Sequence, residues 1–210
     1  ITLNDASVAL SGSAADITAA LAGISGYTGA VTASGTQTGS SGVTAVNTLG
    51  AATAGVVTAT VSGTAAELAS LTTAGTDMIA VPVSNAHDLA QLKAINNATG
   101  GTITLNDASV ALSGSAADIT AALAGISGYT GALTASGTQT GSAGVTAVNT
   151  LGAATSGDVT ATISGTAAEL ALLSTASTDL IAVTLTDAHT LAQLKAINNA
   201  TGGTITLNDA

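Results

Sequence analysis

The chain has 210 residues, with 12 acidic side chains, two lysines, no arginine and a formal net charge of −10. Two lysines cannot line the basic groove that holds a phosphate backbone, so the composition excludes nucleic acid as a natural partner. No apolar run approaches the roughly 20 residues that span a bilayer, and there is no cysteine, so we expect neither membrane insertion nor disulfides.

The sequence repeats itself with a period of 102 residues. Residues 1–102 and 103–204 differ at 14 positions, and residues 205–210 are identical to residues 1–6. We therefore expect a first repeat at 1–102, a second at 103–204 and the start of a third at 205–210. Because the chain begins and ends at the same point of the repeat, we interpret it as a window cut from a longer array.

Each repeat contains a weaker internal repeat. In the second copy its four segments are 101–131, 132–157, 158–178 and 179–202. Each segment opens with a run that is typical of a β-strand and continues into an Ala-rich stretch with helical spacing. Each segment is therefore expected to supply one strand and one helix.

The first segment is longer than the others. Its apolar residues change from one parity to the other across Asn106 and Asp107, which a period-2 strand cannot do without a turn or bulge. We therefore predict a turn at these two residues and a second short strand at 109–112. Ala116, Ile119 and Leu123 then fall on one face of a helix.

The later segments show the same two periodicities. Apolar residues at helical spacing recur in the second and fourth segments, and the third segment opens with strict alternation of apolar and polar residues. The helical sets are Val145, Val148 and Leu151, and Leu191, Leu194 and Ile197; the alternating set is Val159, Ala161 and Ile163.

One strand and one helix per 20–30 residues is the unit of an α/β solenoid. We predict a right-handed α/β solenoid with one parallel strand and one short Ala-rich helix per coil, and about four coils per repeat. The alternative is an all-β solenoid in which the Ala-rich stretches are further strands. Alanine is the best helix former and is depleted in strands, which favours the α/β form.

Most acidic residues have a local explanation as parts of helix caps. A Ser or Thr followed three residues later by an acid forms a capping box, in which each side chain bonds the backbone amide of the other residue. The four pairs are Ser13 and Asp16, Thr64 and Glu67, Ser115 and Asp118, and Thr166 and Glu169. In the fourth segment we expect Asn85 to be the cap, with Asp88 in the first turn. Acids used in this way do not form an active site, and we predict that the protein is not an enzyme.

Four further acids are candidates for a calcium site at the ends of strands. They are Asp5, Asp107, Asp179 and Asp187. Stacked from coil to coil, their like charges would need a cation. We expect no cofactor and keep calcium as the alternative; His87 and His189, one in each repeat, do not form a metal site alone.

Hydroxyl side chains dominate the predicted outward face of the sheet, with one pair for each coil. The residues are Thr102, Thr104, Thr134, Ser136, Thr160, Thr162, Thr184 and Thr186. This ladder resembles the Thr-x-Thr ladders of ice-binding β-solenoids, and an ice-binding or carbohydrate-binding module is the alternative function. The simpler interpretation is that threonine is the polar residue that a half-exposed sheet prefers.

The long repeats rich in Ala, Thr, Gly and Ser, with Val-Ser-Gly-Thr-Ala-Ala-Glu-Leu at 61–68 and Ile-Ser-Gly-Thr-Ala-Ala-Glu-Leu at 163–170, resemble the repeat regions of giant secreted bacterial surface proteins. Cyanobacterial and marine bacterial examples are the most similar. The resemblance covers the whole chain and implies an extracellular or cell-surface location. It also implies a structural role in a rod, fibre, surface layer or adhesin stalk.

The expected partner is a further copy of the protein itself. Strands at 1–3 and 204–207 are expected to lie at the two ends of the stack, without the charge, proline or cap that protects natural sheet edges. We predict that repeats associate end to end through these strand edges, which is a contact that propagates without closing.

Overall fold

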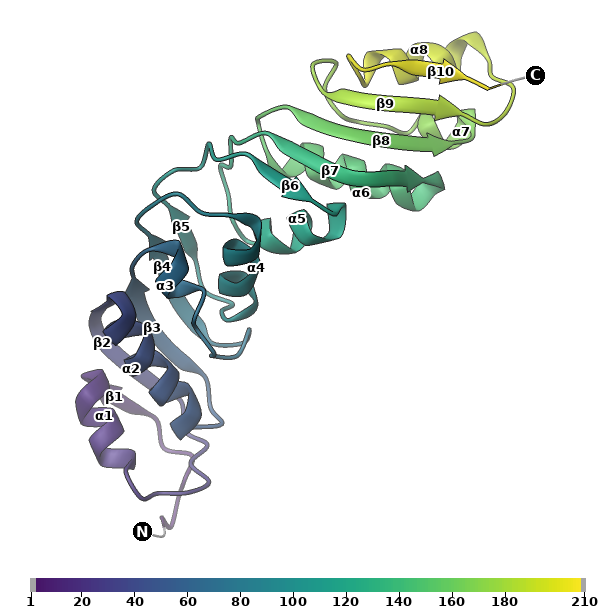
Figure 1. Cartoon of the computed structure of the whole chain (residues 1–210). Coiled ribbons are helices and arrows are strands. Elements are labelled where there is room, and N and C mark those ends of the chain that lie inside the picture. The colour runs from purple at the N-terminus through teal and green to yellow at the C-terminus, as the bar shows by residue number, and fades with distance from the viewer. Residues whose placement is uncertain (1–2, 209–210) are drawn as a thin grey trace. The chain divides into compact units, whose positions relative to one another are not determined.

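The computed structural model describes residues 3–208 and has an α/β fold (Figure 1). Parallel strands alternate with helices and form two five-stranded sheets. The chain divides into two units, of which unit 1 comprises Ile1–Asp107 with Ala124–Ile126, and unit 2 comprises Ala108–Leu123 with Ser127–Ala210. The predicted α/β class is confirmed, and the all-β alternative is wrong because the Ala-rich stretches are helices.

Unit 1 contains one sheet whose strands follow one another in chain order. The elements are β1 (Leu10–Gly12), α1 (Ala14–Leu21), β2 (Val31–Thr38), α2 (Gly39–Ala52), β3 (Val57–Ser62), α3 (Ala65–Leu68), β4 (Met78–Val83), α4 (Leu89–Asn97) and β5 (Ile103–Leu105). The sheet order is β1-β2-β3-β4-β5, and each pairing is parallel. A helix therefore connects each strand to its neighbour.

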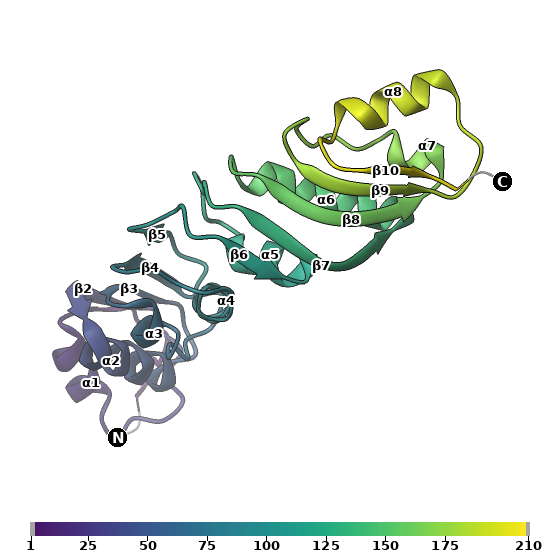
Figure 2. The same cartoon turned by 45° about the horizontal axis from the view of Figure 1, so that its top comes forward.

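Unit 2 has the same plan. Its elements are β6 (Leu112–Gly114), α5 (Ala116–Leu123), β7 (Leu133–Thr140), α6 (Gly141–Ala154), β8 (Val159–Gly165), α7 (Ala167–Leu170), β9 (Leu180–Leu185), α8 (Leu191–Asn199) and β10 (Ile205–Leu207). The sheet order β10-β9-β8-β7-β6 again follows the chain, with parallel pairings. Figure 2 shows the helices α6, α7 and α8 on one side of these strands.

The core of each unit is one layer deep, as the alternation in the sequence predicts. In β8, Val159, Ala161 and Ile163 are buried, whereas Thr160 and Thr162 on the opposite face are exposed. The helices bury the matching stripe; in α6 this stripe is Val145, Val148 and Leu151. Helix and sheet thus bury their apolar faces against each other, and the far face of the sheet stays in solvent.

The region after β5 differs from the prediction in two ways. β5 pairs with β4 and is the last strand of the first sheet, and the strand expected at 109–112 lies instead at Leu112–Gly114. The carbonyl groups of residues 108–110 are used elsewhere: the Ala108 oxygen accepts from Thr130 N and Gly131 N, both at 2.9 Å, and the Val110 oxygen accepts from the Tyr129 hydroxyl. These bonds hold residues 108–110 against the loop that precedes β7.

A second irregularity lies in β7 and in its twin β2. Between two consecutive register points, β7 advances from Thr134 to Thr138 while β8 advances only from Thr160 to Thr162. The extra residues form a bulge at Gly137, whose φ of 73° lies in the left-handed region that favours glycine. Thr134 and Thr138 lie opposite Thr160 and Thr162, and Ser136 lies inside the register shift between them.

Candidate functional site

The four predicted capping pairs lie at helix N-termini. The Ser13 hydroxyl accepts from Asp16 N at 3.1 Å and donates to the Asp16 carboxylate at 2.6 Å. Ser115 and Asp118 repeat this arrangement at 3.1 and 2.7 Å. The serines cap α1 and α5, because each provides an acceptor for an amide that the helix itself leaves without a partner.

Glu67 and its twin Glu169 have a second role beyond capping their own helix. One carboxylate oxygen of Glu67 accepts from Thr64 N at 2.9 Å, which completes the capping box of α3. The other oxygen accepts from Ser40 N at 3.2 Å and from the Ser40 hydroxyl at 3.1 Å. Thr38, the N-cap residue of α2, makes no side-chain cap bond, and Glu67 provides the acceptor in its place. We call one strand with the helix that follows it a coil, so Glu67 belongs to the coil after that of α2.

These hydrogen bonds favour the ionised carboxylates. The Thr64 amide, the Thr64 hydroxyl and Ser40 together lower the pKa of Glu67 below its ordinary value. The equivalent groups lower the pKa of Glu169 in the same way. Each glutamate therefore joins the N-termini of two successive helices as a carboxylate.

A second carboxylate joins successive strands. The buried Asp77 accepts from Val57 N at 2.8 Å with one oxygen and from Ala74 N at 2.9 Å with the other. Asp179 makes the same pair of bonds, to Val159 N at 2.7 Å and to Ala176 N at 2.8 Å. Both oxygens are thus occupied by backbone amides, one of them 20 residues away in the preceding coil.

A third side chain caps a helix in the preceding coil. Asn85 Oδ1 accepts from Ala65 N at 2.8 Å, and Asp187 Oδ1 accepts from Ala167 N at 2.6 Å. The expectation that Asn85 caps its own following helix is therefore wrong. An amide oxygen and a carboxylate oxygen both accept this bond, so the exchange of Asn85 for Asp187 preserves it.

The residue that caps α4 is Asp88, and the residue that caps α8 is Thr190. Asp88 accepts from Gln91 N at 2.8 Å, and Thr190 accepts from Gln193 N at 3.2 Å. Both residues complete a capping box with their glutamine. Asp and Thr are both good N-caps, which explains why this position changes between the copies.

The fourth kind of side chain that bonds a neighbouring coil is a buried threonine hydroxyl. Thr99 accepts from Ile79 N at 2.9 Å and from Gly101 N at 2.8 Å, and its hydroxyl lies 2.8 Å from the Ile79 carbonyl oxygen as a donor. Thr201 has the equivalent partners in unit 2. We refer to Glu67, Asp77, Asn85 and Thr99, with Glu169, Asp179, Asp187 and Thr201, as the inter-coil clamps.

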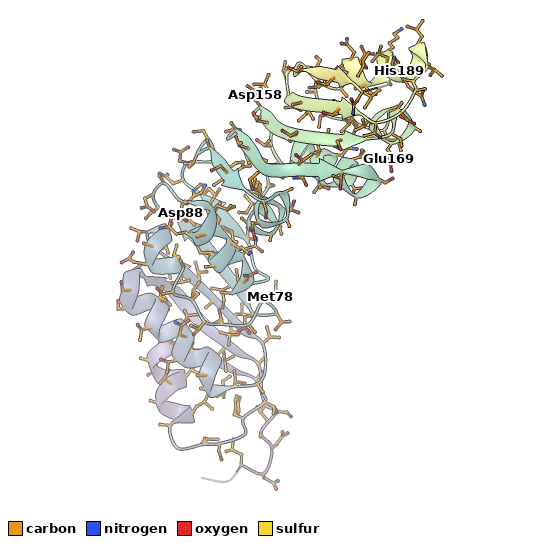
Figure 3. All side chains as sticks on the ribbon, turned by 45° about the vertical axis from the view of Figure 1, so that its right-hand side comes forward. Met78, Asp88, Asp158, Glu169 and His189 are labelled. Atoms are coloured by element: carbon orange, nitrogen blue, oxygen red, sulfur yellow. The ribbon has the colours of Figure 1, made fainter. Side chains whose placement is uncertain are left out.

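The candidate calcium ligands are not gathered in one place. Asp5 accepts from the Ser7 amide and hydroxyl, which lower its pKa, and Asp179 and Asp187 are inter-coil clamps. Within residues 3–208 there is no group of three His, Cys, Asp or Glu side chains that could hold a metal ion. Figure 3 shows Asp158 and Glu169 at opposite ends of β8.

The two histidines have different surroundings. His87 is buried, and burial lowers its pKa, although the nearby carboxylates of Asp107 and Asp88 act in the opposite direction. His189, which Figure 3 labels at the same position before α8, is only half-buried.

The hydroxyl residues of the outward face do not form one grid. All eight are exposed except Thr184, which is half-buried, but Thr102 and Thr104 belong to unit 1 and the other six to unit 2. Thr134 lies opposite Thr160, whereas Thr160 lies opposite Leu180 on the next strand. Ser136, inside the register shift, and the exposed Leu180 therefore interrupt the regular hydroxyl rows that an ice-binding surface would need.

The described part of the chain has a groove beside α2. Its volume is about 380 Å³, and its lining is mainly glycine, alanine and threonine, with one carboxylate, Asp77. Both oxygens of Asp77 already accept backbone amides.

No protein-family model, curated protein or solved structure matches the chain. Within residues 3–208, no helix is both long enough and apolar enough to cross a membrane.

Proposed function

We propose that the chain is a structural module of an extracellular or cell-surface repeat protein. Its strand–helix coils form a right-handed α/β solenoid, and successive copies extend it into a rod, fibre, surface layer or adhesin stalk. Right-handed winding is the rule for parallel strands joined by helices. Such a module presents the same surface again with each copy along the axis of the stack.

The observation that carries this proposal is the repetition of the inter-coil clamps. Asp77 to Val57, Asn85 to Ala65 and Thr99 to Ile79 each span 20 residues, and each bond has an exact counterpart in the second copy. Each clamp satisfies a backbone amide of one coil with a side chain of the next. This arrangement stabilises the contact between neighbours, which is what a repeat array requires.

The same bonds argue against catalysis. A general acid or base needs a carboxyl group that can reach a substrate, and an active site needs unlike groups that converge in a concavity. Here the carboxylates of Asp77, Asp179, Glu67 and Glu169 are engaged by backbone amides. The polar side chains therefore serve the fold, and we propose no reaction.

Electron microscopy of the native material tests the proposal. We expect antibodies against the chain to label the surface of intact cells or extracellular filaments, and we expect an axial repeat that corresponds to one 102-residue copy. Labelling confined to the cell interior, with the protein isolated as single particles, would contradict the proposed role.

A further inference from the structure

Two helices with the same sequence have different exposures in this chain. α4 and α8 both read Leu-Ala-Gln-Leu-Lys-Ala-Ile-Asn-Asn. Leu92 of α4 is fully buried while its twin Leu194 is half-buried, and Leu89 is half-buried while its twin Leu191 is 85% exposed. Because the sequences are identical, the difference comes from what lies against each helix.

In unit 1 the segment Ala124–Ile126 reaches α4 at Asn96. It belongs to unit 1 by its contacts, and Ile126 packs against the hydrophobic core of that unit. The Asn96 side-chain amide of α4 donates to the Ala124 carbonyl oxygen. Asn198, the twin of Asn96 on α8, is exposed.

We propose that the exposed face of α8, formed by Leu191, Leu194 and Asn198, is a docking surface for residues 22–24 of a second copy of this chain. Residues 22–24 have the same sequence as Ala124–Ile126. Leu191, Leu194 and Asn198 are spaced three and four residues apart and so share one face of the helix. In the docked pair the Asn198 amide donates to the Ala22 carbonyl oxygen, and Ile24 covers the apolar part of the face.

The segment already has the conformation in which it would dock. Gly23 has a φ of 73°, and Gly125, in the segment that packs on unit 1, has a φ of 72°. Ala22 and Gly23 are exposed, and Ile24, like Ile126, is half-buried and packs against the core of unit 1. Little ordering is therefore needed on binding, which favours association through a small surface.

The pairing of strands supports contact through the helices in place of the strand edges. β5 pairs with β4 alone, so its sheet ends there although further strands follow in the chain. β10, the twin of β5, is likewise the last strand of its sheet. Of the two terminal strands predicted to associate, 1–3 includes Ile1 and Thr2, which lie outside the described residues. The twin helices α4 and α8 differ in exposure, whereas the twin strands β5 and β10 are both last strands of their sheets. Only the helices therefore indicate a covered and an uncovered state of the same surface.

Each chain offers one docking face and one segment, so the contact is heterologous and propagates. Repulsion from the net charge of −10 opposes it at low salt, and screening relieves that repulsion. The inference rests on the proposed array function. It adds that the face of α8 in one copy meets residues 22–24 of the next copy.

Sedimentation of the 210-residue chain over a concentration series tests it. We expect self-association that strengthens with salt, and we expect Leu191→Asp to weaken it at least tenfold. Leu172→Asp is the matched control, because Leu172 is also an exposed leucine, at 67%, but lies outside α8. A monomeric wild-type chain at all salt concentrations, or equal effects of the two substitutions, would overturn the proposal.

A crosslink identifies the contact itself. The natural chain has no cysteine, so an Ala22→Cys chain mixed with an Asn198→Cys chain has one defined pair of thiols. We expect oxidation to give a mixed dimer, and we expect much less from Ala22→Cys mixed with Leu172→Cys. Equal yields would overturn the docking face, while surface filaments in the micrographs would still support the array function.

Discussion

The exposed positions of the two copies change in chemical character, whereas the joints between coils keep their hydrogen bonds. Exposed positions change freely, from Val56 to Asp158 and from Ser70 to Leu172, and nothing in the structure explains these two changes. The clamps Glu67, Asp77 and Thr99 recur unchanged as Glu169, Asp179 and Thr201, with the same partners. The difference teaches that the bonds to backbone amides between neighbouring coils are the constant part of each unit, and that the surface can vary around them.

Removing the buried carboxylate clamp is expected to have the largest effect. Asp77→Ala leaves the amides of Val57 and Ala74 without their acceptor, and each unsatisfied buried amide costs about 1–3 kcal/mol. We expect a loss of about 3 kcal/mol in the free energy of unfolding, measured by urea denaturation. Asp158→Ala, at an exposed acid, should change it by less than about 0.5 kcal/mol; equal losses would show that the clamp is unimportant.

The hydroxyl clamp should be the next most sensitive. Thr99→Val keeps the shape of the side chain but removes the acceptor for Ile79 N and Gly101 N. We expect thermal and urea unfolding to report a loss of about 2 kcal/mol. Thr104→Val removes an exposed hydroxyl from β5 and serves as the control; a Thr99 variant as stable as this control would contradict the role of the hydroxyl.

The bulge in β7 allows a test of backbone conformation alone. A Cβ atom at Gly137 would meet nothing within 4 Å, but the φ of 73° disfavours any other residue. We expect Gly137→Ala to destabilise the chain by about 1 kcal/mol, and we expect no change from Ser136→Ala beside it. Calorimetry of the two variants measures the difference, and an unchanged Gly137→Ala chain would mean that the bulge relaxes.

The smallest expected effect is on the dependence of stability on pH. The pKa of Glu67 and of Glu169 is lower in the folded chain than the ordinary value of 4.5. Their stabilising contribution is therefore complete above pH 4.5 and is lost as the pH falls through the lowered pKa. We expect Glu67→Gln with Glu169→Gln to flatten this acid limb in melting curves recorded from pH 6 to about pH 3. Asp158→Asn should leave the limb unchanged, and an equally steep limb in the glutamine variant would contradict the assignment.

Local patterns predicted the elements but not the contacts between coils. The alternation of Val159, Ala161 and Ile163 and the three-residue spacing of Thr64 and Glu67 are properties of single segments, and both appear in the structure. The bond from Glu67 to Ser40 joins residues 27 positions apart, which periodicity cannot indicate.

Two other features could have been read from the sequence. Asp77 and Thr99 are polar residues that stand shortly before the strands β4 and β5 and recur in the second copy as Asp179 and Thr201, so these positions could have been singled out from the sequence. Gly137 inside a strand was a signal of the bulge, because glycine in a strand interior often marks one.

The most direct test of the central claim is small-angle X-ray scattering from chains with one and two further copies of residues 103–204 inserted after residue 204. If clamped coils continue as one stack, the maximum dimension will increase by the same amount with each copy while the cross-sectional radius of gyration stays constant. Increments that shrink with each copy, or a cross-section that grows, would contradict the stacked array.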